Sequence, residues 1–316
     1  DYPRELYDII VISDQMQEST NEALRQLPVR LLIADYTDSS KAKAMSLAMN
    51  ATADIPYDAV VIMDADNTAG TSFLSELNPV FQSGARAVQA HRTAKNTNTD
   101  IAVLDAASEE INNSIFRSGH IALGLSSALI GSGMALEACW FRQHIHLLET
   151  AGEDKEMEAL LLKQRIHIEY LEHVYVKDEK TQKKEGIKNQ RKRWIAAQFD
   201  SLVRALPDFP KELLRGNIDY CDKVFQWTLL PRIILIFCTF FFTILVTLVS
   251  PYSSIKWWIL AFALFLALFT AIPGHLLNKQ LLWAIFQLPS LLLGIASNLF
   301  KLKGVNKKFI HTEHGN

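Results

Sequence analysis

The chain has 316 residues and a formal net charge of −2, a length that allows about two domains. Its three cysteines show no paired spacing, which argues against a disulfide framework and a zinc site and is typical of a reducing cytosol. The charge is unevenly divided: residues 1–228 carry 25 basic and 33 acidic side chains, or −8, and residues 229–316 carry seven basic and one acidic, or +6. We therefore expect two regions, 1–228 and 229–316, and no nucleic-acid partner.

The first region alternates between strand and helix patterns. Four apolar runs of strand length are separated by helical stretches, one of which begins with serines suited to a helix cap. Such alternation favours an α/β fold with a mostly parallel sheet, whose ligands bind beyond the carboxyl ends of the strands. Asp14, Asp35, Asp64 and Asp66 all lie at such ends. The expected strands are 7–13, 29–35, 57–66 and 85–93, and the serine-capped helix is 39–53.

The stretch "VVIMDADNTAG" (60–70) ends the third expected strand with Asp64 and Asp66. Alternate strand residues project to the same side, so the two carboxylates lie together. Hard oxygen donors without a neighbouring His or Cys suit Mg²⁺ or Mn²⁺ shared with phosphate oxygens. The stretch resembles two enzyme classes: haloacid-dehalogenase (HAD)-type phosphatases, with Asp64 as nucleophile, and nucleotide-sugar glycosyltransferases. An acidic turn after a strand is the alternative without chemistry.

Two later motifs help to choose between these classes. "GEDKEM" (152–157) places Glu153 and Asp154 at the start of an expected helix, where acidic residues are also favoured by the helix dipole alone. "QRKRW" (190–194) joins a basic stretch to Trp194, which is unusual for a merely solvated face. A HAD-type phosphatase normally carries its nucleophile on the first strand, whereas two strand–helix units precede Asp64 here.

The second region, 229–316, has the composition of membrane-spanning helices. Residues 233–249 and 257–277 contain no Asp, Glu, Lys or Arg, and about 20 apolar residues cross a hydrocarbon core. We expect spans at about 233–250 and 257–277, joined by a tight turn, with both outer ends in the cytoplasm by the positive-inside tendency. Residues 281–300 are apolar but interrupted, and "KLKGVNKK" follows them. They favour an interfacial segment, with a third span as the alternative.

The order DxD, ED, QxxRW and then membrane helices resembles the family 2 membrane-bound inverting glycosyltransferases, the group that contains cellulose, chitin and hyaluronan synthases. Looser matches are "VISD" (11–14), "KAKAM" (41–45), "GSGMAL" (131–136) and "FIHTEH" (309–314). Ser40, Phe309 and His314 depart from the family pattern. The resemblance implies a GT-A type, mostly parallel sheet flanked by helices, its first strand missing from a fragment that opens without Met. A transmembrane helical hairpin and an interfacial helix would follow it.

The resemblance also implies that the protein is a hexosyltransferase. It would be a multi-pass membrane protein of a bacterial inner or plasma membrane, with its catalytic domain in the cytoplasm. The expected donor is a nucleotide-diphosphate sugar, a UDP-sugar first, and the acceptor is a polysaccharide or a lipid-linked glycan. An inactive membrane partner with the same fold is the further alternative. The implied roles are general base for Asp154; donor binding for Asp14, Lys41, Asp64 and Arg193; metal binding (Mg²⁺ or Mn²⁺) for Asp64 and Asp66; and acceptor binding for Gly131, Ser132, Gly133, Glu153, Gln190 and Trp194.

Overall fold

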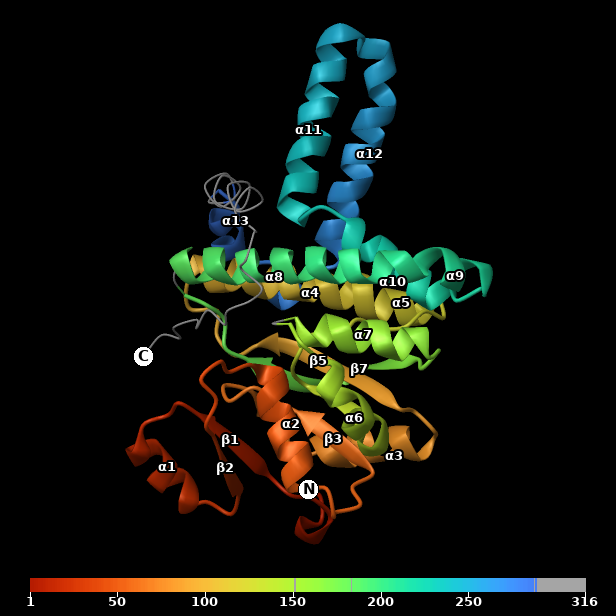
Figure 1. Ribbon diagram of the computed structural model, residues 1–316. Coiled ribbons are helices and arrows are strands. Elements are labelled where there is room, and N and C mark those ends of the chain that lie inside the picture. The colour runs from red at the N-terminus through yellow and green to blue at the C-terminus, as the bar shows by residue number, and fades with distance from the viewer. Residues whose placement is uncertain (151, 183, 287, 289–316) are drawn as a thin grey trace.

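The computed structural model describes residues 1–150, 152–182, 184–286 and 288, and its strands form two sheets (Figure 1). β1 (Ile10–Asp14) pairs in parallel with β2 (Arg30–Ala34). The second sheet has the order β3-β6-β5-β7-β4. Its strands are β3 (Ala59–Ile62), β4 (Thr68–Ala69), β5 (Ala87–Ala94), β6 (Met134–Glu137) and β7 (Ile168–Asp178).

The α/β class is confirmed, but the sheet is mixed and not mostly parallel. β5 runs parallel to β7, whereas β6 is antiparallel to both β3 and β5, and β4 is antiparallel to β7. The four expected strands correspond to β1, β2, β3 and β5. β3 and β5 share one direction because both are antiparallel to β6, and β7 shares it because it is parallel to β5. The strands β4 and β6, which make the antiparallel pairs, are short and lie outside the four expected strands. Their pairing depends on distant partners that local sequence does not reveal.

Helices cover the sheets, and a second tier of helices lies between the large sheet and the hairpin (Figure 1). A serine caps α2 (Lys41–Ala51) as expected: the Ser40 hydroxyl accepts a hydrogen bond from the Lys43 amide at 3.2 Å. The helices near the sheets are α1 (Glu18–Arg25), α2 (Lys41–Ala51), α3 (Phe73–Gln82) and α6 (Ala138–His144). The second tier contains α4 (Asp100–Asn113), α5 (Gly119–Ala122), α7 (Glu153–Lys163), α8 (Lys184–Ala205), α9 (Phe209–Leu214) and α10 (Ile218–Thr228). Short 3₁₀ turns lie at Arg4–Leu6, Ile145–Leu147 and Leu206–Asp208, and a π-helical turn at Ser114–Ser118.

The main hydrophobic core joins the large sheet to this tier. Leu136 and Ile168 of the large sheet pack in one cluster with Leu161 of α7 and Trp227 of α10, all of them buried. Burial of such side chains contributes about 2 kcal/mol each. The core therefore fixes α7 and α10 on the sheet, and with them the residues at the start of α7.

Two C-terminal helices, α11 (Arg232–Val249) and α12 (Pro251–Thr270), are long and apolar enough to cross a membrane. Only 6% and 11% of their most apolar windows are buried, so they are not core helices. They form the expected hairpin, but the turn is confined to Ser250, and α12 begins and ends about six residues earlier than the expected span 257–277. Pro251 explains the early start, because proline suits the first turn of a helix.

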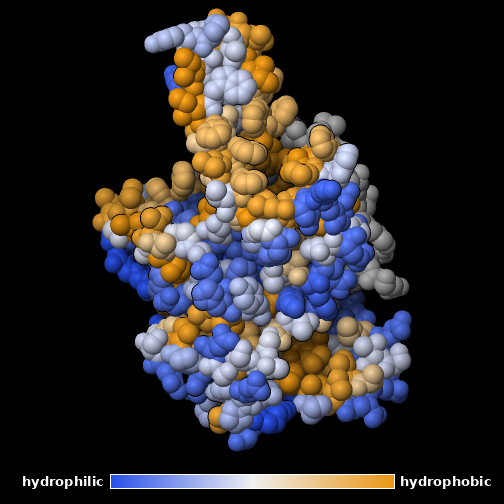
Figure 2. All heavy atoms as spheres, turned by 180° about the vertical axis from the view of Figure 1, so that it is seen from behind, coloured by the Kyte–Doolittle hydropathy of each residue, from blue (hydrophilic) through white to orange (hydrophobic). Residues whose placement is uncertain are grey.

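The expected interfacial segment 281–300 is described only in part. A 3₁₀ turn (Gly274–Leu276) leads into α13 (Lys279–Ile285), whose buried residues Leu281 and Ala284 face the protein, with Leu281 against α4. Residues 287 and 289–316, including "FIHTEH", lie outside the described residues. In Figure 2 the apolar surface is concentrated on the hairpin and around its base, with a polar belt below.

A buried ion pair links α7 to α10. Lys223 lies 3.2 Å from Glu158, and their side chains are 3% and 2% exposed. The same Glu158 oxygen accepts the Leu129 amide at 2.6 Å. The pair therefore holds α7, α10 and the segment that leads to Gly131 in one arrangement.

We expect Lys223→Met to lower the free energy of unfolding by about 3 kcal/mol, because it leaves the Glu158 carboxylate buried without its cation. Lys163→Met is the matched control: its pair with Asp208 is 43% and 34% exposed, and its loss should cost less than about 1 kcal/mol. Guanidinium titration of the detergent-solubilised chain measures both. Equal stability of the Lys223→Met variant and the unmodified chain would contradict the role given to the pair.

Candidate active site

A continuous cavity of about 2270 Å³ extends from the edges of β1 and β3, past the start of α7, to the base of the hairpin. Its middle is polar. Lys41, Asp64, Asp66, Glu153 and Asp154 border it there. These residues come from three separate segments, so the fold brings together the DxD and ED motifs that lie about ninety positions apart in sequence.

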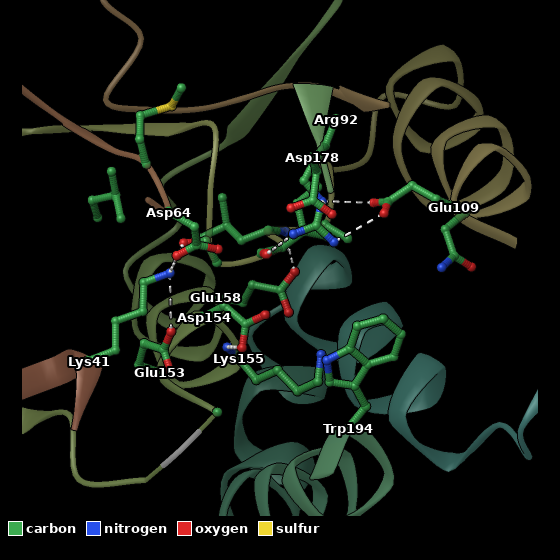
Figure 3. A pocket seen from close by; sticks show the side chains of 18 of the residues that line it. Lys41, Asp64, Arg92, Glu109, Glu153, Asp154, Lys155, Glu158, Asp178 and Trp194 are labelled. Atoms are coloured by element: carbon green, nitrogen blue, oxygen red, sulfur yellow. Dashed lines mark hydrogen bonds and ion pairs between the residues drawn. The ribbon is translucent and has the colours of Figure 1, made fainter. Parts of the chain in front are cut away.

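Lys41 is the cation at the centre of this polar group (Figure 3). Its ammonium donates hydrogen bonds to Asp64 and, at 2.7 Å, to the carbonyl of Gly131, and it lies 3.9 Å from Glu153. Gly131 has a φ of +79°, and a Cβ there would lie 3.7 to 3.9 Å from Glu153, Lys41 and Asp154. Glycine thus provides the left-handed conformation that this turn requires. The turn itself forms one wall of the site.

Glu153 and Asp154 are the first two residues of α7. Glu153 is 8% exposed. Burial, together with the neighbouring Asp154 charge, raises the pKa of Glu153 to about 7, although Lys41 opposes the shift. Asp154 accepts the Lys155 amide at 2.8 Å and borders the cavity. Two adjacent carboxyl groups with different surroundings are suited to divide acid–base and structural roles.

Asp66 is held from the far side by a bridging amide. The Asn67 side chain donates to Asp66 and to Asp178, both at 3.0 Å. Asp178 is the last residue of β7 and borders the cavity. Sequence reasoning missed Asp178 because β7 was not among the expected strands. A strand-terminal carboxylate was the available signal.

A buried charge network supports Asp178 (Figure 3). Arg92 makes two hydrogen bonds of 3.1 Å to Glu109, and Lys180, 2% exposed, lies 2.5 Å from Glu109 and 2.9 Å from Asp178. Burial opposes ionisation of Glu109, yet Arg92 and Lys180 hold its pKa well below the ordinary range. The sequence signal was a charged residue, Arg92, inside an expected buried strand.

α8 contributes the QxxRW residues to the opposite wall. Gln190, Arg193 and Trp194 all border the cavity. Burial lowers the pKa of Arg193, while Glu153 and Asp64 are near enough to oppose that shift. The Gln190 amide oxygen is buried and has no hydrogen-bond partner among the described residues. An unpaired buried acceptor is costly, so a ligand donor at this point would be favourable.

Two predicted site residues, Ser132 and Gly133, are buried, whereas Asp14 lies at a strand end as expected. Ser132 is fully buried and accepts a hydrogen bond from Arg92 at 3.3 Å. Gly133 packs against Val176, which a Cβ would approach to 3.1 Å. In this structure Ser132 and Gly133 thus support the Gly131 turn, and their acceptor contacts stay a prediction. Asp14 is exposed at the end of β1, where it accepts the Ser39 hydroxyl and borders the cavity.

The donors available for a metal ion are carboxylates. Within the described part of the chain no group of three or more His, Cys, Asp or Glu side chains is arranged to hold a metal ion. Mg²⁺ in phosphate-handling sites uses one or two protein carboxylates and completes its shell with phosphate oxygens and water. Asp64 and Asp66, both at the polar part of the cavity, fit that requirement in number and chemistry.

The raised pKa of Glu153 predicts a pH-dependent stability. Between its ordinary value of 4.5 and about 7, the folded chain binds a proton that the unfolded chain has released, so stability falls as the pH rises through this range. The loss is at most roughly 3 kcal/mol. Glu153→Gln removes the ionisable group, and its melting temperature should exceed that of the unmodified chain at pH 8 but not at pH 5.

Thermal unfolding of both proteins in detergent at about pH 5 and pH 8 checks this linkage. Glu172→Gln is the control, because Glu172 is exposed and its replacement should leave the pH dependence unchanged. A stability difference between Glu153→Gln and the unmodified chain that is the same at both pH values would refute the expectation.

The family model described as glycosyl transferase family group 2 matches residues 59–270, whereas no curated protein matches. Among solved structures, a mycobacterial protein is similar with 13% identity and a TM-score of 0.43, over 61% of this chain and 64% of its own length. Residues 1–349 of S. aureus TarS are similar with 12% identity and a TM-score of 0.43, over 96% and 82%. Because the family model covers more than half of its residues, the chain belongs to glycosyl transferase family group 2.

Proposed function

We propose that the protein transfers a hexosyl unit from a nucleotide-diphosphate sugar to a hydroxyl group of a membrane-associated acceptor, with inversion at the anomeric carbon. One observation carries this proposal: Lys41, Asp64, Gly131 and Glu153 meet within hydrogen-bond or ion-pair distance at one cavity, with Asp154 beside them. Family membership favours glycosyl transfer over the phosphatase alternative, in which Asp64 would be a nucleophile.

The donor side contains the cations that a diphosphate needs. Lys41 and Arg193 border the cavity near Asp64, and the planar guanidinium of Arg193 can pair with two phosphate oxygens. Asp14 and Asp64 lie at strand ends on this side and would hold the nucleoside, of which uridine is the first expectation. Asp64 and Asp66 would hold Mg²⁺ or Mn²⁺, which when bound neutralises charge on the departing diphosphate.

The acceptor side contains the base. Asp154 would take the proton of the acceptor hydroxyl as its oxygen bonds to the anomeric carbon, while the bond from that carbon to the diphosphate oxygen breaks. Trp194 offers an aromatic face for the acceptor sugar, and Gln190 offers the unpaired amide oxygen. Burial raises the pKa of Glu153 to about 7, so this neighbour of Asp154 would be mostly neutral below that pH.

The membrane assignment rests on the hairpin and on charge. The two apolar helices are exposed, and most basic residues of region 229–316 flank the outer ends of the hairpin, which supports a cytoplasmic site by the positive-inside tendency. We propose residues 1–228 as the catalytic domain and 229–316 as the membrane region. Assignment to the cellulose, chitin and hyaluronan synthase group remains part of this proposal.

Asp154→Asn should lower sugar transfer by at least about 100-fold, because it removes a general base, while binding of nucleotide diphosphate stays within a factor of about two of the unmodified chain. Radiolabelled sugar transfer and calorimetric titration measure the two properties. Asp54→Asn is the control, since Asp54 is exposed. Retained transfer by Asp154→Asn would rule out this base. Nucleotide binding without transfer from any donor by the unmodified chain would favour an inactive partner.

A chelator should abolish transfer, and added Mg²⁺ or Mn²⁺ should restore it. Asp66→Asn should raise the metal concentration needed for half-maximal transfer by about ten-fold or more, because a carboxylate donor to a hard cation is replaced by a neutral amide. A metal titration of transfer, with Asp54→Asn again as the control, measures this. An unchanged metal requirement in Asp66→Asn would remove Asp66 from the metal site.

A further inference from the structure

Beyond the polar centre, the cavity becomes an apolar groove at the base of the hairpin. Ile111 of α4, Leu264, Phe265 and Phe269 of α12, and Leu281 of α13 line this part. Phe265 and Phe269 are 58% and 47% exposed, so the groove opens on the side where α12 would contact lipid. Figure 2 shows the apolar surface continuing from the hairpin to its base. A neutral glycan has no apolar chain to place there.

Two arginines lie where the groove meets the polar centre. Arg191 of α8 and Arg232, the first residue of α11, both donate to the Ser108 hydroxyl of α4, at 3.2 and 3.5 Å. Arg191 pairs with Asp105 at 3.1 Å. Arg232 donates to the Ser108 carbonyl at 3.3 Å and to the Asn112 side chain. Its hydrogen-bond partners among the described residues are therefore all neutral.

This arrangement has more positive than negative charge. Two guanidinium groups that share one hydroxyl repel each other, and in a half-buried position water compensates the repulsion poorly. The arginine pair has one carboxylate, Asp105, which is 6% exposed and oriented toward Arg191. The positive end of the α11 dipole adds to the field at Arg232. An anion with several oxygens would satisfy both guanidinium forks, and phosphate matches their geometry.

We propose that Arg191 and Arg232 bind the phosphate headgroup of a lipid-linked acceptor, whose apolar chain lies in the groove along α12 and α13. This inference rests on the proposed function, because it names the acceptor of that same site. Arg191 lies over the Trp194 ring at 5.2 Å, and Trp194 borders the same cavity as Asp154. A sugar attached to the bound phosphate would therefore extend over Trp194 toward Asp154.

The reaction then involves only the sugar of the acceptor. A hydroxyl of the lipid-borne sugar loses its proton to Asp154, its oxygen bonds to the anomeric carbon of the donor, and the nucleotide diphosphate leaves. The bonds between lipid, phosphate and first sugar stay intact. The arginine pair contributes binding and position, whereas the chemistry stays at the start of α7.

The test uses the full chain in nanodiscs of neutral phosphatidylcholine. Its probes are farnesyl phosphate, farnesol and inorganic phosphate, and binding is followed by tryptophan fluorescence. Farnesyl phosphate should bind, and Arg232→Gln should weaken its binding by about ten-fold or more, because a charged hydrogen bond is lost. The affinity of Arg232→Lys for farnesyl phosphate should lie between those of Arg232→Gln and the unmodified chain. Arg204→Gln, on the same α8 but 51% exposed and paired with Asp200, should leave binding unchanged.

Each other outcome overturns the inference. Equal affinity for farnesol would mean that the chain alone is recognised, and equal affinity for inorganic phosphate that the groove adds nothing. Competition by phosphatidylglycerol discs as strong as by farnesyl phosphate would assign the arginines to bulk lipid headgroups. Nucleotide diphosphate binding, measured in the same discs, shows whether each variant is folded. Its absence in the unmodified chain would defeat the proposed function itself, whereas its presence without farnesyl phosphate binding would defeat only this inference.

Discussion

The contact of the Lys41 ammonium group with Asp64 is the interaction on which the geometry of the candidate active site depends. The ammonium is bonded to Asp64, 23 residues away, and to the carbonyl of Gly131, 90 residues away, and it lies 3.9 Å from Glu153. Without this cation, the acidic side chains of Asp64, Glu153 and Asp154 would repel one another across a partly buried space. Lys41 therefore determines how closely the DxD segment, the glycine turn and α7 can approach. A diphosphate donor would bring its own negative charge to the same cation.

A second layer of compensated charge lies behind the first. The charges of Arg92 and Lys180 are balanced by Glu109 and Asp178, and Asp178 contacts Asp66 through Asn67. Such a network is strongly stabilising only when every member is paired. The carboxylates at the cavity are thus fixed from behind by buried ions and hydrogen bonds. They are also open toward the cavity in front, which is the requirement for binding a charged ligand with little rearrangement.

The sequence indicated much of this site because its residues lie at the ends of regular elements. Asp64 follows a buried strand, Lys41 begins a capped helix and Asp154 begins another, and each position could be read from local pattern. Asp178 ends a strand as well, but its position beside Asp66, with Lys180 behind it, depends on the pairing of β7 with β5 and β4, which local sequence does not reveal. The contact of Ser132 with Arg92 could not be predicted either, because it depends on tertiary packing. The hairpin was predicted from composition, whereas its turn depends on Pro251 as a helix start.

In the proposed arrangement, donor and acceptor contact opposite sides of the same turn of α8. Successive residues of an α-helix are rotated by about 100°, so Arg191 and Arg193 point in nearly opposite directions. Arg193 is near Glu153 and Asp64, on the donor side, whereas Arg191 contacts Asp105 of α4, beside the start of the hairpin. Trp194 lies between the two sides, with Arg191 over its ring. In the proposed arrangement, a rotation or shift of α8 would therefore change donor and acceptor contacts together.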